Sequence, residues 1–190
     1  MAQNSEVVEL KKLNISRMML KLRGISPLIM HKWSDKAKRE MLDKQMKKTK
    51  TAKAAKDPQA DYEASMYRDA DGHPCFPCVA FKAAAVDAAL SMDMKKTNLR
   101  QSFHVTGEMV KIVGEPSMRE DMVRIGMGTA DIRHRAEFKQ WACVLPISYN
   151  ANMISAEQIV NLFQSAGFGV GVGEWRPQKD GSFGMFEVVP

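Results

Sequence analysis

The chain has 190 residues, of which 45% are hydrophobic, and carries a formal net charge of +6. This length and composition permit one domain with a full hydrophobic core, and no apolar run approaches the roughly 20 residues needed to span a membrane. The N-terminal residues lack the order of a secretion signal, and three cysteines are too few for a disulfide framework. We therefore expect a single cytoplasmic domain over residues 1–190, with no membrane partner.

Positive charge is concentrated in one segment. From Lys32 to Lys56 the sequence holds ten Lys or Arg against three Asp or Glu, a net charge of +7 that leaves −1 for the rest of the chain. A basic segment of this kind is the expected footprint of a polyanionic partner, although a solvated loop has the same composition.

The first predicted element is a strand over residues 15–24, where two sets of side chains alternate. The apolar set is Met18, Leu20 and Leu22, and the basic set is Arg17, Lys21 and Arg23. Alternation of period two indicates a half-buried strand. We expect its basic side to contact nucleic acid.

A basic insertion is predicted over residues 32–74, after a turn and a short extended stretch. Ser34 is expected to cap a helix that ends near Met46, and residues 59–69 favour a second short helix. Residues 47–58 have almost no large apolar side chain, so we expect them to be flexible until a ligand orders them. The candidate contacts in this segment are Lys47, Lys48, Lys50 and Lys53.

The next predicted elements are an extended stretch at residues 72–77 and a helix at residues 79–92. Helical spacing places Val79, Ala83, Val86 and Leu90 on one face, which we expect to be buried. A Cys-x-x-Cys spacing precedes the helix, with a histidine nearby, but a second ligand pair is missing. The residues concerned are His73, Cys75 and Cys78, and we expect no metal there.

Residues 95–135 form a polar, variable region with two candidate short strands at 107–113 and 121–127. Arg133 and Arg135 at its end are candidate nucleic-acid contacts. His104 and His134 lie among arginines, which suits phosphate contact or acid–base cleavage of RNA as well as plain exposed loops. Ala136 to Ile147 is expected to form one long strand inside a sheet.

The last helix has clear signals at both ends. Ser155 and Gln158 fit a capping box, and Ile154 and Ile159 fit a hydrophobic staple. The predicted buried stripe follows at helical spacing and comprises Ile159, Leu162, Phe163 and Ala166. We expect Gly167 to end the helix as a left-handed C-cap.

A glycine-rich segment then leads into a final strand near residues 182–189. Because a helix precedes these glycines and a strand follows them, neither a P-loop nor a dinucleotide fingerprint fits, and we expect no cofactor. Backbone amides of a glycine turn can cradle phosphates, and an aromatic ring beside cations can stack a base. The candidate contacts are Gly169, Gly171, Gly173, Trp175, Arg176 and Lys179. Tight packing of the turn explains the glycines equally well.

Taken together, the elements follow a β-α-β-β-α-β order. The sequence therefore predicts an α+β fold with a ferredoxin-like, RRM-like antiparallel sheet and two helices on one face. A basic insertion follows the first strand, and a Gly-rich loop precedes the last one.

Residues 75–90 (CFPCVAFKAAAVDAAL), residues 167–188 (GFGVGVGEWRPQKDGSFGMFEV) and the long basic insertion resemble the RAMP superfamily of CRISPR RNA-guided complexes. The resemblance implies an RRM-like fold similar to the crRNA-binding backbone subunits, whose copies stack along a single strand. Val79 and Ala83 to Ala85 stand where the family usually has Ser and Gly, and the chain is short for a backbone subunit. These departures suggest a standalone, phage-borne relative.

The leading hypothesis is a non-catalytic protein that binds single-stranded RNA or DNA through its backbone and assembles along it as a homo-oligomer or filament. One alternative is a metal-independent RNA-processing endonuclease of the same superfamily that uses His31, His104 or His134. Another is a phage protein-interaction module or inhibitor that acts on a nucleic-acid machine.

Overall fold

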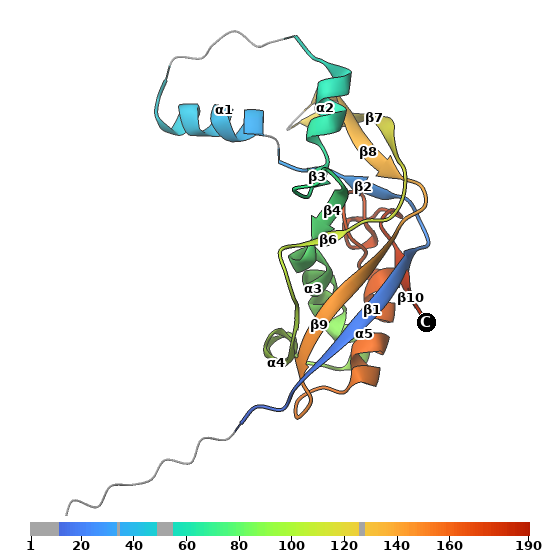
Figure 1. The fold of residues 1–190 in the computed structure, drawn as a ribbon. Coiled ribbons are helices and arrows are strands. Elements are labelled where there is room, and N and C mark those ends of the chain that lie inside the picture. Colours follow the sequence, from blue (N-terminus) through green and yellow to red (C-terminus); the bar gives the residue numbers. More distant parts are fainter. Residues whose placement is uncertain (1–11, 34, 49–54, 126–127) are drawn as a thin grey trace, which may run out of the picture.

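The computed structural model describes residues 12–33, 35–48, 55–125 and 128–190. Its main sheet has four strands, all antiparallel, in the order β10-β1-β9-β5. The strands are β1 (Ile15–Gly24), β5 (Phe103–Val105), β9 (Ala142–Asn150) and β10 (Phe186–Val189). Two helices, α3 (Cys78–Asp87) and α5 (Ala156–Gly169), lie behind the sheet in Figure 1 and leave its other face open.

This arrangement fixes the topology of the body. In chain order its elements are β1, α3, β5, β9, α5 and β10, which is a βαββαβ unit whose fourth strand lies beside the first. The protein is therefore an α+β fold with the ferredoxin-like strand order that the sequence predicted.

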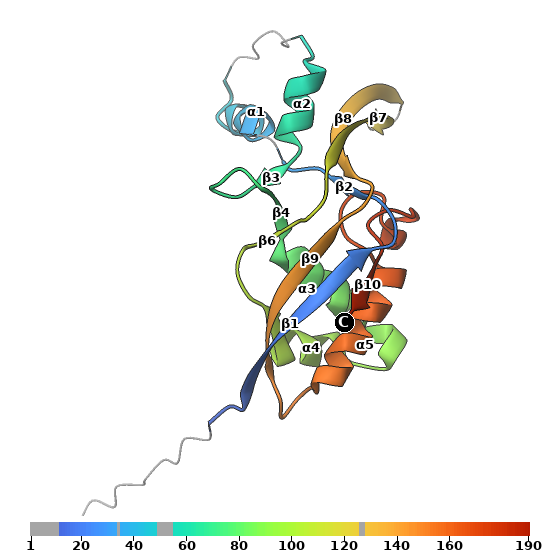
Figure 2. The same cartoon turned by 45° about the vertical axis from the view of Figure 1, so that its right-hand side comes forward.

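Outside this unit, α1, α2 and the strands β2, β3, β7 and β8 lie at one end of the body, at the top of Figures 1 and 2, whereas α4 lies at the lower end. A second sheet has the order β2-β8-β7 and a third has the order β3-β4-β6. Their strands are β2 (Leu28–Met30), β3 (Tyr67–Arg68), β4 (Pro74–Pro77), β6 (Met109–Lys111), β7 (Pro116–Ile125) and β8 (Thr129–Phe138). The other helices are α1 (Asp35–Gln45), α2 (Pro58–Ala64), η1 (Ala88–Met92), α4 (Lys96–Ser102) and η2 (Pro177–Lys179).

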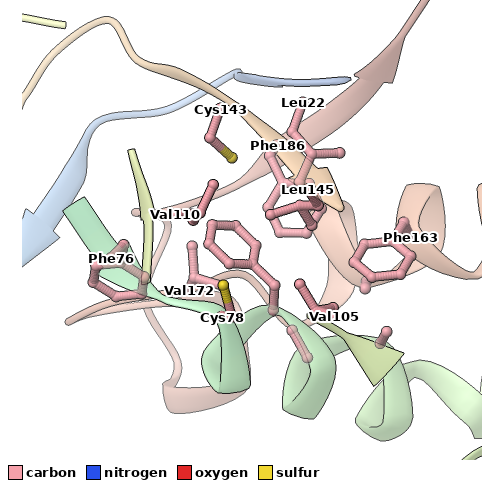
Figure 3. Packing of buried hydrophobic residues seen from close by; sticks show 14 of the residues in the cluster. Leu22, Phe76, Cys78, Val105, Val110, Cys143, Leu145, Phe163, Val172 and Phe186 are labelled. Atoms are coloured by element: carbon pink, nitrogen blue, oxygen red, sulfur yellow. The ribbon is translucent and has the colours of Figure 1, made fainter. Parts of the chain in front are cut away.

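The hydrophobic core lies between the main sheet and its two helices. Figure 3 shows Leu22, Leu145 and Phe186 of the sheet in the same cluster of side chains as Phe163 of α5. Phe186 is fully buried and makes edge-on contacts with the rings of Phe81 and Trp141, at centroid distances of 6.0 and 6.3 Å. Such aromatic pairs add to the free energy gained by burial alone.

Strand β1 has the predicted bounds and the predicted faces. Leu20 and Leu22 are buried, whereas Arg17, Lys21 and Arg23 are exposed. The basic side of β1 therefore lies on the open face of the sheet.

The long strand predicted over residues 136–147 is wrong. Two strands occupy this stretch: β8 pairs with β7 and β2, whereas β9 pairs with β1 and β5 in the main sheet. Trp141 stands between them and donates its indole N–H to the carbonyl of Ser26 at 2.9 Å. The first half alternates and the second half is apolar on both faces, which is also the pattern of one continuous strand, so the sequence does not record the change of sheet.

The buried face predicted for the helix after Cys78 is also wrong for most of its residues. Val79 and Leu90 are 69% and 81% exposed, while Phe81 is fully buried. The helix is alanine-rich, so its apolar pattern fits more than one face. The largest side chain, Phe81, sets the face that packs.

Helix α5 confirms the capping box, with Ser155 and Gln158 exchanging both hydrogen bonds, and the predicted stripe is buried. The prediction for Gly167 is wrong, because the helix continues to Gly169. A Cβ at Gly167 would overlap with the carbonyl oxygen of Phe186, so this glycine lets α5 approach β10 closely.

The predicted insertion, residues 32–74, contains α1, α2 and β3, and the predicted variable region, residues 95–135, supplies β5 to the main sheet. The predicted cap Ser34 and the predicted contacts Lys50 and Lys53 lie outside the described residues. In the part of the chain that is described, no helix is long and apolar enough to cross a bilayer.

Candidate nucleic-acid interface

The open face of the main sheet mixes basic and apolar side chains. Arg17, Lys21 and Arg23 project from β1, and the register places them beside Ser148, Val144 and Ala142 of β9. Met19, on the same face, is 64% exposed. Cations can meet phosphates and exposed apolar atoms can meet bases, so this face suits an unpaired strand.

The three cations differ in how far the protein already satisfies them. Arg23 donates to the carboxylate of Glu187 on β10, with an Nε–Oε1 distance of 2.9 Å, and Lys21 donates to the carbonyl of Pro190 at 2.8 Å. Both contacts are exposed and therefore exchange readily with a ligand. Arg17 stands farther along the strand, beside a shallow depression.

That depression has a volume of about 180 Å³. Its lining includes Arg17, Met19, Thr106, Pro146 and Ser148. It lies where β1 and β9 meet the end of β5. The open face therefore has a shallow depression next to the exposed guanidinium of Arg17.

The glycine-rich segment is built mainly by internal packing. Gly171 and Gly173 have positive φ values of 68° and 80°, a conformation that glycine adopts without steric cost. Added Cβ atoms there would approach Pro177 and the carbonyl of Ile29 to within 3 Å, at 2.8 and 2.6 Å respectively. Gly169 is different, because a Cβ at that position would meet no atom within 4 Å.

Backbone donors of this segment are largely used inside the protein. The N–H groups of Gly171, Val172 and Glu174 donate to the carbonyls of Ala166, Gly184 and Ile29, respectively. The segment therefore offers side chains to a ligand rather than a row of free amides, which weakens the predicted phosphate cradle.

The side chains that follow the glycines are partly available. Trp175 is 43% exposed and lies 6.0 Å from the guanidinium carbon of Arg135. Arg176 donates from Nη1 to the carbonyl of Gly173 at 3.1 Å, and Lys179 is exposed. Trp175, Arg176 and Lys179 thus offer side chains at the end of the glycine-rich segment and in η2 (Pro177–Lys179).

Arg135 has a structural environment that the sequence did not predict. Its side chain is only 3% exposed, and it bonds to Asp121 at 3.1 Å and to Glu174 at 3.5 Å. It therefore joins the β7–β8 hairpin to the glycine-rich segment. Its guanidinium is too buried to contact a nucleic-acid strand that lies on the surface. Arg133, the other predicted contact on β8, is partly exposed and lies 3.8 Å from Asp131.

Glu174 also receives a contact from His31, whose Nδ1 lies 3.3 Å from its Oε1. This hydrogen bond, followed by the charges of His31, Arg135 and Arg133, lowers the pKa of Glu174 although burial opposes the shift. The carboxylate is thus held in its charged form at the junction of β2, β8 and the glycine-rich segment.

A small pocket that the sequence did not predict opens beside β8. Its volume is about 210 Å³, and it lies where β2 has ended opposite Ala136 and no longer covers the edge of β8. Its lining includes the basic residues His31, Lys32, Lys56, Arg133, His134 and Arg135 and the acidic residues Asp61 and Asp131. Trp33, which is 51% exposed, stands in the same lining. The only hint in the sequence is the His-Lys-Trp run after β2, because the partners come from residues far along the chain.

The predicted contacts Lys47 and Lys48 are exposed at the end of α1. Lys48 pairs with Asp43 at 3.1 Å, and Lys47 has a positive φ of 54° in the turn that ends the helix. They are separate from the open face of the sheet, as Figure 1 shows for the end of α1.

The cysteines are buried, and burial raises the pKa of the Cys143 thiol to about 12. His73 is exposed and faces Asp69 rather than the thiols of Cys75 and Cys78. Within the described ranges, one group could hold a metal ion by proximity: Asp69, Asp71 and His73. Backbone N–H groups of Asp71 and His73 already bond to Asp69, so the turn explains the cluster.

Fold and surface together define this chain as an α+β protein with a ferredoxin-like sheet and an open, partly basic face. Among solved structures it is similar to the crystal structure of Cmr6 from Pyrococcus furiosus. The TM-score is 0.48 at 9% sequence identity, over 94% of this chain and 100% of that one. No family model matches the chain, and no curated protein matches it. Because this structural similarity is low, the ferredoxin-like fold is assigned from the strand order of the main sheet alone.

Proposed function

We propose that this protein binds single-stranded RNA or DNA on the open face of its main sheet and assembles along the strand as copies of itself. The observation that carries the proposal is the alternation of Arg17, Lys21 and Arg23 with exposed apolar side chains on a face that no described helix covers. Phosphate contacts from these cations position a strand without reading its sequence.

Assembly is supported by the helix α1, which stands apart from the body in both Figure 1 and Figure 2. Met41 and Leu42 on it, and Met46 just beyond its end, are 48%, 54% and 56% exposed. Exposed apolar side chains on a projecting helix suit burial against a neighbour. When several copies bind one nucleic-acid strand, the adjacent copy is the neighbour that α1 would contact.

The test compares two variants that each lose three exposed cations. Arg17, Lys21 and Arg23 are changed to Ala in one, and Lys95, Lys111 and Lys139 in the other. We expect the slope of log affinity against log salt for dT15 and rU15 to fall by about three units in the first variant, about one unit for each lost phosphate contact. Equal losses in both variants would show that only net charge matters and would refute the open face as the site.

A second candidate is a metal-independent RNA endonuclease, because His31 and His134 line the same pocket together with cations. His104 is not part of it; this residue is exposed on β5, and its Nδ1 lies 3.0 Å from the Nζ of Lys82. Two histidines can act as base and acid in transfer of a phosphoryl group.

Incubation with structured RNA in the presence of a chelator separates the two functions. Site-specific cleavage that disappears in His31→Ala supports the endonuclease. Intact RNA that is bound by wild-type protein supports the binding protein.

A further inference from the structure

The pocket beside β8 contains a buried side chain with one nitrogen that no protein group satisfies. His134 is only 9% exposed, and its Nε2 lies 3.0 Å from Oε2 of Glu120 on β7. Its Nδ1 is buried and has no hydrogen-bond partner among the described residues. An unsatisfied polar atom at such depth is unfavourable, and a ligand atom that bonds to it removes the cost.

The next residue of β8, whose side chain points to the opposite face of the strand, has a second atom of the same kind. The Nε of Arg135 is also buried without a partner in the described part of the chain, although both Nη atoms of this residue are bonded. Its N–H can only donate, so the group that would satisfy it is an acceptor. Both residues line the pocket of about 210 Å³.

The rest of the lining supplies positive charge, the two carboxylates of Asp61 and Asp131, and an aromatic plane. Arg133 and Lys32 lie at the pocket with partly exposed side chains, and Lys56 donates to Asp131 and to the carbonyl of Ile132. Trp33 is half exposed at the same place. Cations select an anionic acceptor such as phosphate, and an exposed indole can stack a base.

We propose that this pocket binds one nucleotide, its phosphate ester held by Arg133 and Lys32, its base stacked on Trp33 and another of its polar atoms bonded to Nδ1 of His134. The proposal rests on the proposed function and deepens it. A strand bound on the open face would place one of its unpaired nucleotides in this pocket, out of line with the nucleotides on either side. The same chemistry also fits a free nucleotide, so the experiment separates the two sources.

The probes are UMP and thymidine monophosphate, with uridine and inorganic phosphate as partial ligands, and the signal is tryptophan fluorescence. Wild type and Trp175→Phe should show saturable quenching by the nucleotides, and Trp33→Phe should not. Lys32→Ala combined with Arg133→Ala should weaken nucleotide binding by about tenfold or more, because bonds to charged groups are lost. The matched control, Lys95→Ala with Lys111→Ala, should leave it unchanged. His134→Gln should weaken nucleotide binding as well. If His134→Gln unfolds, the double variant at Lys32 and Arg133 still tests the proposal.

A second arm uses dT15 and rU15 to locate the source of the nucleotide. If the cation pair weakens both the mononucleotide and the oligonucleotides, the pocket receives a nucleotide of the strand. If it weakens only the mononucleotide, the pocket binds a free nucleotide. Oligonucleotide binding with no quenching of Trp33 and no effect of the pair overturns the pocket and leaves the proposed function standing. Binding of nucleotides without any binding of oligonucleotides supports the pocket and refutes the proposed function.

Discussion

At the scale of single residues, two neighbouring glycines of α5 have opposite environments. Gly167 is buried against the carbonyl of Phe186, whereas Gly169 is exposed and open. The sequence displays both in the same alternating run. Their roles differ because β10 approaches the helix only at the first of them.

We expect Gly167→Ala to destabilise the fold by about 1–3 kcal/mol, since the added methyl forces β10 away from α5. Gly169→Ala is the matched control. It should be neutral or stabilising by up to about 1 kcal/mol, because alanine favours the helix and meets no obstacle. Urea denaturation of both variants measures the difference, and equal stabilities would contradict the close approach.

Glu174 makes stability depend on pH. Its pKa in the folded state is lowered below the ordinary value of 4.5, chiefly by the hydrogen bond from His31. A group with a depressed pKa stabilises the fold above its unfolded pKa and loses that contribution as the pH falls through the folded one.

Wild type should therefore be more stable than Glu174→Gln at pH 7, and the difference should shrink as the pH is lowered below 4.5. Unfolding free energies at pH 7, 5 and 4 and below, from urea titrations, test this expectation. A difference that stays constant throughout this range would assign the effect of the substitution to packing.

At the scale of elements, the β7–β8 hairpin is held to the body by charged side chains. Arg119 bonds to Asp121 and Glu137, both at 2.8 Å, and its guanidinium lies 4.8 Å from the ring of Phe183. Arg135 adds the link to Glu174. The two ion pairs of Arg119 lie within the hairpin, and the contacts with Phe183 and Glu174 fix its base against the glycine-rich segment.

Arg135→Met should reduce stability by about 1–3 kcal/mol, because Asp121 and Glu174 lose their shared cation while Asp121 keeps Arg119 and Glu174 keeps His31. Arg124→Ala, an exposed position of β7, is the control and should change stability by no more than about 0.5 kcal/mol. Thermal melts distinguish the two. If Arg135→Met melts like wild type and loses affinity for dT15 or rU15, then Arg135 is a contact of the strand after all.

At the scale of the whole molecule, the surfaces with proposed roles lie on different sides of one chain. Figure 2 shows the open sheet in front of α3 and α5, with α1 projecting from the opposite end. In the proposed function, this separation leaves the open face free for a strand while α1 contacts a neighbouring copy.

Leu42→Glu combined with Met46→Glu should leave binding to short oligonucleotides unchanged and reduce the number of copies on long strands. Charged side chains at these positions oppose burial against a neighbour. Native mass spectrometry on rU15 and rU60 counts the copies. The control is Leu90→Glu, an 81% exposed residue on η1, which should load as wild type does. Normal loading of the α1 variant on rU60 would exclude α1 from the assembly contact.

The sequence by itself determined the features that depend on local periodicity and capping. The alternation of β1 fixed its faces, the capping box fixed the start of α5, and the order of elements predicted the βαββαβ unit. Each depends on residues a few positions apart, whose geometry is nearly independent of the rest of the chain.

Only the tertiary structure decided the rest, because it depends on which distant segments meet. Residues 136–147 alternate first and are apolar later, as one long strand inside a sheet would, yet pairing with β2 and β7 at one end and with β1 at the other divides them between two sheets. Arg135 looks in the sequence like a basic surface residue, yet Asp121 and Glu174, 14 and 39 positions away, enclose it. The pocket beside β8 joins residues 31–33 to residues 131–135 in the same way. Burial and charge pairing are properties of such long-range contacts, so no local pattern encodes them.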